Sequence, residues 1–387
     1  MKSFQFTPTP TIIFGIGKRK ELPRLIGNYG SHTLIITGGG SFRKSAIGSE
    51  LLDEIKINFE YSNFEAVAGE PTSEIIDKIV DKYRQIPLDV IVAIGGGSVL
   101  DAGKAISAMI FKNESIVEYL EGVGSRKPDG SKLPFIALPT TSGTGSETTK
   151  NAVISKVGIN GFKKSLRHDN YIPNIALVDP ELTITCSPEI TASSGMDAFT
   201  QLLEAYVSSK STDFIDLFAY QGLQLVAKNI KKTFDDGEGI HARASMSYAA
   251  MLSGIALANS GLGTVHGFAS SIGALYPIPH GVVCGTLMAE CVALNVEKLE
   301  KTKGEAYAKY VNAGKLFTNK NEQSDDYYCK VLIDSLRGLT EEMKLPKLSA
   351  YGIKREDFDA IVLETDNKNN PVELSKADMM HILEERL

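Results

Sequence analysis

Short apolar runs alternate with a helical pattern in the first 185 residues of the chain. Six runs rich in β-branched side chains are closed by Gly, Pro or Asp, as strands are: TIIFGIG, TLIIT, DVIVAI, PFIALPTT, AVISK and NIALVDP. Residues 72–86 (TSEIIDKIVDKYRQI) place apolar side chains at the spacing of one helix face. Strands that alternate with helices predict an α/β fold, in which helices cover a mostly parallel sheet.

A different pattern begins near residue 186. Ser187 followed by Pro188 has the form of a helix cap with a first-turn proline, and strand-like runs become scarce after it. Residues 188–209, 214–234 and 242–261 then carry apolar positions at spacings of three and four, as amphipathic helices do. One hydrophobic core stops growing at about 250–300 residues. The 387-residue chain is therefore predicted to contain an α/β domain (1–185) and an all-α domain (186–387).

The composition excludes several classes of protein. With 41 basic and 47 acidic side chains the net charge is −6, which disfavours binding to the phosphate backbone of nucleic acid. Apolar runs are far shorter than the about 20 residues of a membrane helix, so we expect no membrane span. The four cysteines lack CxxC spacing and follow no secretory segment, so we expect reduced thiols in a cytoplasmic protein: Cys186, Cys284, Cys291 and Cys329.

A glycine turn joins the strand DVIVAI to the helix that follows it: Gly95, Gly96, Gly97 and Ser98. A turn without Cβ atoms lets backbone amides approach an anion, and the next helix points its positive end at that anion. A tight turn without any ligand explains three glycines equally well. The neighbourhood favours a phosphate site, because a second hydroxyl-rich loop, PTTSGTGSE, follows the next strand, and the two loops are placed to enclose a dinucleotide. The additional candidates are Asp101, Thr140, Thr141 and Thr144.

Another glycine run closes an earlier strand: Gly38, Gly39, Gly40 and Ser41. An acidic residue at such a strand end hydrogen-bonds the ribose 2′-hydroxyl of NAD, whereas a 2′-phosphate requires nearby cations. This run has no acidic residue, and Arg43 and Lys44 follow it. The sequence therefore favours NADP. NAD remains possible, because solvated charges on a helix also explain the two cations.

Two histidines and one aspartate are candidates for a metal site. His266 and His280 lie in GLGTVHGFASSIGALYPIPHG, and Asp197 lies in a predicted helix of small and apolar residues, where an unpaired charge is costly. Gln201 shares the helix face of Asp197. One carboxylate and two imidazoles suit Zn²⁺ or Fe²⁺. The alternative, that these are satisfied buried side chains, stays open on spacing alone.

These motifs together resemble the iron-containing (group III) alcohol dehydrogenase family over nearly the whole chain. The matching stretches are GGGSVLDAGKAI, PTTSGTGSE, IALVDPEL, SGMDAFTQLLEAYVS and HGFASSIGALYPIPHG. The resemblance implies a Rossmann-like dinucleotide-binding domain, a helical domain with a metal in the cleft, and a homodimer or larger homo-oligomer. The TGGGS run is similar to that of NADP-using butanol and aldehyde-reducing members.

The resemblance also implies roles for individual residues. Gly95 to Ser98 would hold the pyrophosphate of the dinucleotide, and Asp101 and the three threonines would lie beside it. Lys163 or Lys164 would approach the cofactor, and we expect Lys164 to be the one that binds it. Asp197, His266 and His280 would form the catalytic metal centre. The family usually has histidine at the positions of Gln201 and Ser270. The first departure leaves three outcomes open: weaker iron binding, a change to zinc, or an empty site.

The expected activity is hydride transfer between a nicotinamide cofactor and a small alcohol or aldehyde, with metal as a Lewis acid. Two alternatives remain: a nucleotide-binding module without metal or catalysis, and a lyase of the dehydroquinate synthase type. The lyase would require several basic residues around its substrate, and we expect few of them in the helical half.

Overall fold

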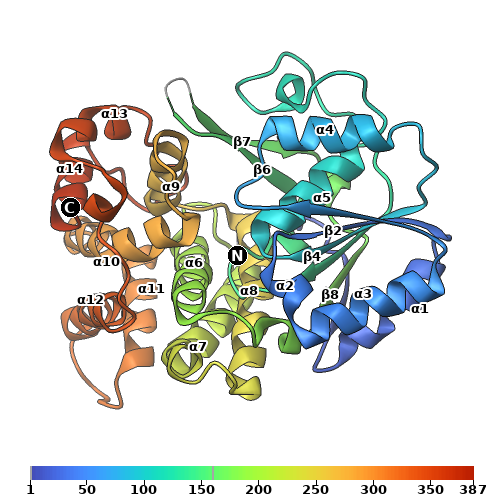
Figure 1. The fold of residues 1–387 in the computed structure, drawn as a ribbon. Helices are drawn as coiled ribbons and strands as arrows, with labels where there is room; N and C mark the ends of the chain where they lie inside the picture. The colour runs from blue at the N-terminus through green and yellow to red at the C-terminus, as the bar shows by residue number, and fades with distance from the viewer. Residues whose placement is uncertain (1, 159–160) are drawn as a thin grey trace.

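The computed structural model describes residues 2–158 and 161–387, and within these the chain forms an α/β half and a helical half (Figure 1). The strands are β1 (Thr11–Phe14), β2 (His32–Gly38), β3 (Tyr61–Val67), β4 (Val90–Gly95), β5 (Phe135–Pro139), β6 (Asn151–Lys156), β7 (Phe162–Arg167) and β8 (Ile175–Val178). The helices of the first half are α1 (Leu22–Gly27), α2 (Ser41–Lys44), α3 (Ala46–Asn58), α4 (Ser73–Tyr83) and α5 (Gly97–Met109). Those of the second half are α6 (Pro188–Val207), α7 (Asp213–Asp235), α8 (Ile240–Ser260), α9 (Thr264–Leu275), α10 (His280–Leu299), α11 (Glu305–Gly314), α12 (Asp325–Glu342), α13 (Phe358–Leu363) and α14 (Lys376–Glu385).

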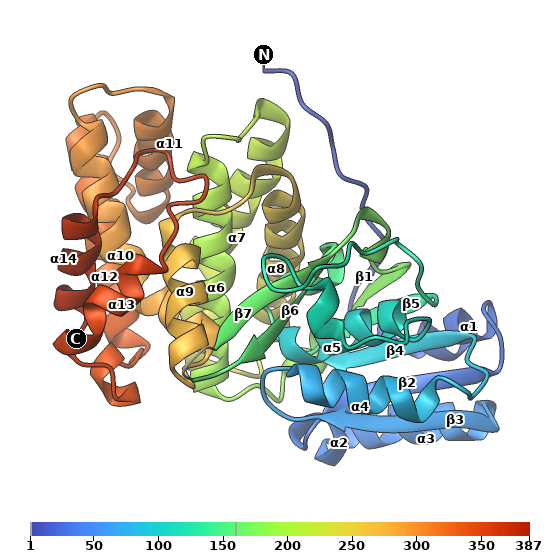
Figure 2. The same ribbon diagram turned by 90° about the horizontal axis from the view of Figure 1, so that it is seen from above.

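Six of the described strands form one parallel sheet in the order β1-β8-β5-β4-β2-β3. Strands β6 and β7 form a separate antiparallel hairpin that extends toward the helical half (Figure 2). The predicted architecture, a parallel α/β sheet followed by helices, is confirmed.

Strand β4 shows how the sequence builds the layers. Its side chains alternate between the two faces of the sheet because successive residues of a strand point in opposite directions. Ile91 and Ala93 pack in the core beneath α4 and α5, whereas Val92 and Ile94 pack in the core beneath α1 and α3. A strand buried on both faces needs a continuous apolar run, which is why the run DVIVAI predicted it.

Two of the strands were not predicted from the sequence. Strand β3 is an edge strand, YSNFEAV, whose side chains are mostly part-exposed, and β7, FKKSLR, carries three cations. A strand that pairs on one side or faces solvent needs no continuous apolar run, so its pattern resembles that of a loop. Strand β7 matters most, because it reaches the cleft described below.

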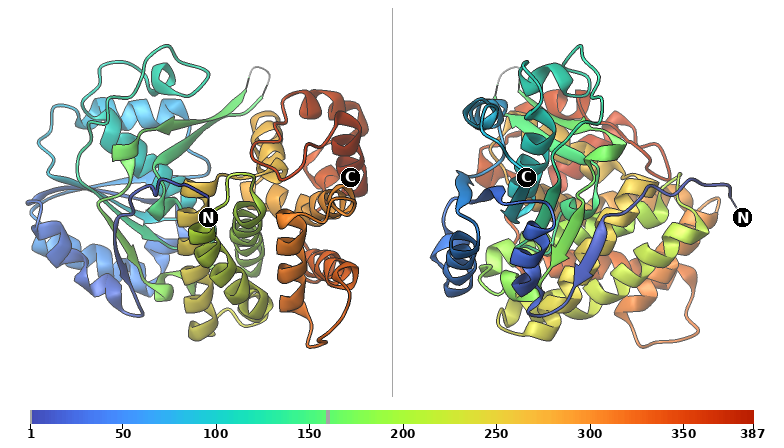
Figure 3. Two further views of the ribbon diagram at one scale, coloured as in Figure 1. Left: turned by 180° about the vertical axis from the view of Figure 1, so that it is seen from behind. Right: turned by 90° about the vertical axis from the view of Figure 1, so that its right-hand side faces the viewer.

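The two halves meet where the carboxyl ends of the strands face α6, α8 and α9 (Figures 1 and 3). The last strand ends at Val178 and α6 begins at Pro188, where the Ser187 hydroxyl accepts a hydrogen bond from the backbone NH of Ile190, as the cap prediction required. Thr148, from the loop after β5, donates a hydrogen bond to the carbonyl of Met251 on α8 (3.2 Å). Among the described residues, no helix combines the length and apolar character needed to cross a membrane.

Candidate functional site

The turn from β4 into α5 needs glycine for packing reasons. A Cβ on Gly95 would lie 2.5 Å from the Cβ of Val99, and a Cβ on Gly97 would lie 2.4 Å from Cγ2 of Thr144. At Gly96 the nearest atoms, those of Thr141, would be 3.4 Å away. The predicted second loop therefore packs directly on the first, and α5 begins at Gly97 with its amino end at this junction.

Lys104 and Asp101 fasten the two loops together. The Lys104 ammonium, fully buried, donates to the carbonyls of Ser146 (2.9 Å) and Asn151 (2.7 Å). The Asp101 carboxylate accepts from the Ser146 hydroxyl and from the backbone NH of Val153 (2.9 Å). Burial lowers the pKa of Lys104 to about 8 and raises the pKa of Asp101. These two side chains therefore brace the loops, and Asp101 also faces the cleft.

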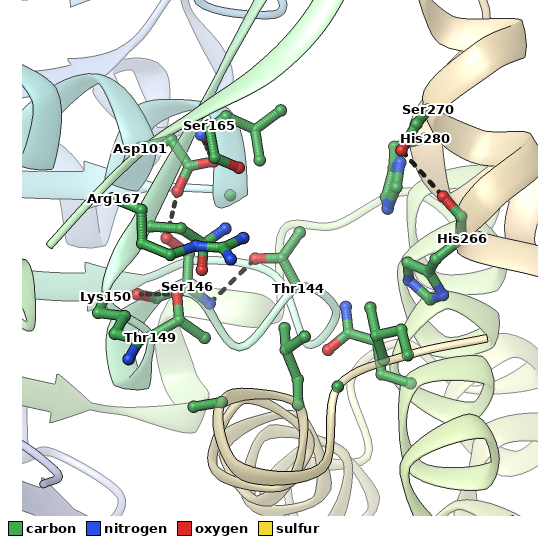
Figure 4. Close-up of a pocket in the computed structure, with 18 of the residues that line it drawn as sticks. Asp101, Thr144, Ser146, Thr149, Lys150, Ser165, Arg167, His266, Ser270 and His280 are labelled. Atoms are coloured by element: carbon green, nitrogen blue, oxygen red, sulfur yellow. Dashed lines mark hydrogen bonds between the residues drawn. The ribbon is translucent and has the colours of Figure 1, made fainter. Parts of the chain in front are cut away.

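A cleft of about 750 Å³ separates these loops from the helical half. Figure 4 shows Asp101, Ser165 and Arg167 on the strand side, facing His266, Ser270 and His280 on the helical side. The glycine turn and the candidate metal residues therefore open into one cavity, as a reaction between a bound cofactor and a bound substrate requires.

The predicted cofactor residues fall into two groups. Gly97, Ser98, Asp101 and Thr144 line the cleft. The others lie at or near the same carboxyl edge of the sheet but outside the lining: Gly38, Gly39, Gly40, Ser41, Gly95, Gly96, Thr140 and Thr141. Cofactor binding by the residues of either group stays a prediction.

Of the two lysines proposed to approach the cofactor, Lys163 lines the cleft, and a contact between Lys164 and the cofactor stays a prediction. Neighbouring residues of a strand point to opposite faces, and on β7 Lys163 lines the cleft while Lys164 is exposed. Lys163 also forms an ion pair with Glu70 (3.0 Å).

Four potential metal-binding side chains converge from three helices: Asp197 on α6, His266 on α9, and His280 and Cys284 on α10. One ligand atom from each lies within 4.8 Å of all the others. The structure therefore brings together the three residues predicted as metal ligands. The sequence did not predict Cys284 as a member of this group. Its position four residues after His280, which puts both side chains on one helix face, could have indicated it.

Glycines allow α10 to approach α6 closely enough for this cluster. A Cβ on Gly281 would lie 2.3 Å from the carbonyl oxygen of Ser193, and a Cβ on Gly285 would lie 2.8 Å from the Cβ of Met196. With no side chain between the two helices at these points, His280 and Cys284 reach Asp197.

Glu204 fixes the ring of His266. The Glu204 carboxylate lies 2.7 Å from Nδ1 of His266 and also accepts from the backbone NH of Val265 (2.8 Å). Nδ1 then carries the donated hydrogen, so Nε2 is left as a lone-pair donor facing Asp197 Oδ1 at 3.4 Å. A carboxylate behind a histidine is the usual arrangement at metal sites.

The cluster's electrostatics also suit a cation. Burial lowers the pKa of His280 to about 4, so its imidazole is neutral at pH 7. Burial alone would raise the pKa of Asp197, but the neighbouring imidazoles and Gln201 outweigh it and lower that pKa. The buried Nδ1 of His280 has no hydrogen-bond partner among the described residues. An anionic carboxylate beside neutral imidazoles is a donor set that fits a divalent metal.

Gln201 lies beside this cluster with its amide already engaged. Its Nε2 donates to Asp197 Oδ1 (3.2 Å), and its Oε1 accepts from the Ser253 hydroxyl (2.9 Å). Gln201 therefore orients the Asp197 carboxylate, and its role as a ligand stays a prediction.

Among the described residues, five cations line the cleft. Lys163 and Arg167 lie on β7, Lys150 directly precedes β6, and Lys210 and Lys368 lie in two loops of the helical half. Two of the five thus come from the helical half, where few basic residues were expected, and sequence spacing does not reveal that they converge with the other three.

Comparisons with known proteins agree with this site. The family described as iron-containing alcohol dehydrogenase matches residues 8–180, and its C-terminal domain matches residues 191–387. The chain is 31% identical over 390 residues to an NADPH-dependent butanol dehydrogenase of Clostridium saccharobutylicum, covering 98% of this chain and 97% of the relative. It is 29% identical over 385 residues to an NAD-dependent methanol dehydrogenase of Bacillus methanolicus, covering 98% of each.

A solved structure gives the same result. An alcohol dehydrogenase from Oenococcus oeni superimposes with a TM-score of 0.86 at 27% identity, and the match covers 100% of both chains. The family matches extend over both halves and include the glycine turn and the four residues of the candidate metal cluster. The chain therefore belongs to the iron-containing alcohol dehydrogenase family and is a metal-dependent alcohol dehydrogenase that uses NAD(P).

Proposed function

We propose that this chain interconverts small aldehydes and alcohols in the cleft between its halves, with NADPH as the preferred reductant. Residues 1–185 bind the dinucleotide, and residues 186–387 hold the metal through Asp197, His266 and His280. The observation that carries the proposal is the cluster of one carboxylate and two imidazoles, which opens into the same cleft as the amino end of α5. A nucleotide-binding module without catalysis would not need such a cluster.

Different residues of the chain have different roles in the proposed reaction. A divalent cation at the cluster supplies Lewis-acid polarisation of the substrate oxygen, and the nicotinamide supplies or accepts the hydride. Glu204 holds His266 so that Nε2 stays a lone-pair donor. The backbone at Gly97 and Ser98 orients the cofactor phosphates at the start of α5. The Ser270 hydroxyl donates to the carbonyl of His266 (2.9 Å).

The end of β2 supports a preference for NADPH. Arg43 donates to the Thr37 hydroxyl and to the carbonyl of Glu65 (2.8 Å), which holds a cation against this strand end. The Lys44 side chain passes 4.0 Å from where a Cβ on Gly40 would lie, and it remains exposed. A 2′-phosphate at this turn would meet two cations and no carboxylate from residues 37–44.

Replacement of Asp197 tests the proposal directly. We expect Asp197→Ala to abolish reduction of butanal and to lower the content of bound metal, because the only carboxylate of the ligand cluster is lost. Affinity for NADPH, measured by fluorescence titration, should change little. Full turnover by the metal-depleted variant would refute the proposed role of the cluster.

We further propose that the protein is a cytoplasmic homodimer. Strand β1 is the first strand of the sheet, with one neighbour only, and an unpaired edge is a common place for a second copy to join. All four cysteines are free, as reduced cytoplasmic thiols would be. Light scattering coupled to size exclusion would give the mass in solution, and a monomeric mass would contradict the dimer.

A further inference from the structure

Cys284 lies at distances from the two histidine rings that a shared tetrahedral metal ion would require. Its Sγ lies 3.7 Å from Nε2 of His266 and 3.8 Å from Nε2 of His280. Oδ1 of Asp197 lies 3.4 Å from Nε2 of His266 and 3.7 Å from Nε2 of His280. Tetrahedral zinc with Zn–N of about 2.0–2.1 Å and Zn–S of about 2.3 Å separates N from S by about 3.6 Å and N from O by about 3.3 Å. The four measured edges are close to these values.

Among residues 2–158 and 161–387, no other side chain offers an equivalent fourth donor in this cluster. The carbonyl oxygen of the Gln201 amide already accepts from Ser253, and its amino group faces Asp197. Cys284 is buried and has no hydrogen-bond contact other than the two ring nitrogens in the described part of the chain. Its sulfur faces the two ring nitrogens that a bound cation would also contact.

We propose that Cys284 is the fourth protein ligand of the metal, and that this sulfur makes the site select zinc over iron. When the metal binds, a metal–sulfur bond forms and the thiol proton passes to solvent. A thiolate is a soft donor, and a set of two imidazoles, one carboxylate and one thiolate favours Zn²⁺. With four protein ligands, the substrate oxygen would have to add as a fifth ligand, and catalytic zinc sometimes expands to that coordination number in the transition state.

Cobalt substitution tests this assignment without measuring activity, and it rests on the proposed metal site. The apoprotein would be loaded with Co²⁺, and its near-ultraviolet spectrum would be recorded for sulfur-to-cobalt charge transfer. We expect the band in the unmodified protein and in Cys291→Ser, because Cys291 is a buried thiol of the same helix outside the cluster. We expect no band in Cys284→Ser, a substitution that nearly preserves side-chain volume.

Zinc loading and X-ray absorption separate the possible results. A zinc-loaded protein with one sulfur at about 2.3 Å supports the proposal. Bound zinc with only nitrogen and oxygen neighbours overturns the sulfur ligand and leaves the proposed function intact, whereas absence of any bound metal refutes the metal site itself. Loading from an equimolar mixture of Zn²⁺ and Fe²⁺ under reducing conditions should give mainly zinc, and the preference should fall in Cys284→Ser.

A separate observation concerns two lysines of the cleft. Lys210 and Lys368 have no carboxylate within 4.0 Å among residues 2–158 and 161–387, whereas Lys150 and Lys163 are paired with Asp169 (2.6 Å) and Glu70 (3.0 Å). The Lys368 ammonium lies 3.5 Å from the hydroxyl of Ser270, one helical turn after His266. Two cations without a carboxylate partner thus line the cleft, and one of them, Lys368, lies beside the helix that carries His266.

The fold fixes the backbone of the two loops that carry these exposed lysines. A Cβ on Gly267 would lie 2.0 Å from the carbonyl of Asp366, so α9 packs directly on the loop that carries Lys368. Lys368 itself has a left-handed backbone (φ 51°), which is costly for a residue with a side chain. The next residue, Asn369, accepts from the backbone NH of Ser209 (2.9 Å), and this bond joins the loops of Lys368 and Lys210.

From these contacts we infer that the substrate is a small aldehyde with an anionic group at its far end. The carbonyl lies at the cluster, and the Lys368 and Lys210 ammonium groups bind the anion as charge-assisted donors. A carboxylate, a sulfonate and a phosphonate share this chemistry. The inference rests on the proposed aldehyde reduction and narrows its substrate class.

Matched aldehydes test the substrate class. Initial rates with NADPH would compare butanal with the four-carbon aldehyde that ends in a carboxylate, and then with two-carbon aldehydes that carry a sulfonate or a phosphonate. We expect kcat/KM for one of these anions to exceed that of butanal by about tenfold or more. Lys368→Met and Lys210→Met should each lower this ratio about tenfold, as loss of a charged hydrogen bond does. Lys354→Met, an exposed lysine outside the cleft, should leave the ratio unchanged.

Three outcomes would overturn the substrate class. The first is a wild-type preference for butanal over every anion, and the second is an equal loss of rate on butanal and on the anions in both lysine variants. The third is a weaker Kd for NADPH in those variants, which would assign the lysines to the cofactor. Failure to reduce any aldehyde, charged or neutral, would instead refute the proposed function.

Discussion

His266 is held from both sides by carboxylates with different tasks. Glu204 accepts from Nδ1 at 2.7 Å, and Asp197 lies 3.4 Å from Nε2. Burial of the ring pulls the pKa of His266 down, but Cys284 and Glu204 more than compensate and raise it. Because an imidazole must be neutral to bind a metal, a raised pKa means that a proton competes with the metal for Nε2 of His266.

The orienting role of Glu204 leads to a first prediction. Glu204→Gln should weaken Zn²⁺ binding by about 10-fold to 100-fold, because an amide holds the Nδ1–H tautomer less firmly than a carboxylate does. Isothermal titration of the apoprotein would measure it. Glu189→Gln, a change at the exposed start of the same helix, is the control and should bind zinc normally.

Gly38 provides a second prediction, on the choice of cofactor. A Cβ at this position would lie 3.8 Å from Cγ2 of Val99, an ordinary contact, so Gly38→Asp fits without rearrangement. Its carboxylate would repel a 2′-phosphate and accept from a 2′-hydroxyl. We expect the ratio of kcat/KM for NADPH to that for NADH to fall by at least about tenfold. Gly38→Asn has nearly the same shape without the charge, and an equal fall in that variant would contradict the electrostatic explanation.

The turn between β4 and α5 requires glycine for two different reasons. At Gly97 the neighbouring loop leaves no room for a Cβ, since Thr144 would be 2.4 Å away, whereas at Gly96 the nearest contact would be 3.4 Å. Packing against Thr144 thus explains why residue 97 is glycine, whereas packing alone would leave more room for a side chain at position 96. Approach of a phosphate to the turn supplies a reason for glycine at 96.

The two glycines therefore predict opposite phenotypes. Gly97→Ala should lower the free energy of unfolding by about 1–3 kcal/mol, as overpacking does. Gly96→Ala should unfold close to the wild-type temperature and yet bind NADPH more weakly, because its methyl group occupies the space of the phosphate. Thermal unfolding and fluorescence titration would be measured on both variants. Normal NADPH affinity in Gly96→Ala would remove the phosphate from this turn.

The loop after β5 packs directly on helix α8. A Cβ on Gly254 would lie 2.2 Å from the carbonyl of Gly145 and from the hydroxyl of Thr148, so the backbone of α8 touches the loop directly. This contact joins the cofactor-facing loop to the helical half.

Gly254→Ala should therefore destabilise the protein by about 1–3 kcal/mol and raise KM for both cofactor and aldehyde. Gly338→Ala is the matched control: this glycine lies inside α12 with nothing within 4 Å of its added methyl group, so the change should stabilise by about 0.5–1 kcal/mol. Unfolding midpoints and steady-state rates would distinguish them. Equal effects of the two substitutions would show that the contact with the loop is unimportant.

The sequence by itself determined the parts that local patterns encode. Continuous apolar runs gave the strands β4 and β5, three-and-four spacing gave α6, α7 and α8, and glycines between a strand and a helix gave the turn at Gly95. Each is a property of neighbouring residues, because burial on a strand or helix face repeats at a fixed period. The polar strands β3 and β7 lack that repeat, and they were missed.

Only the tertiary structure decided which side chains meet. Lys163 rather than Lys164 enters the cleft because of the register of the β6–β7 hairpin. Cys284 joins Asp197 because glycines let α10 approach α6, and Lys210 joins Lys368 through a bond between distant loops. Contacts between residues far apart in the chain depend on how helices and loops pack. The spacing of residues along the sequence does not determine the distance between such side chains.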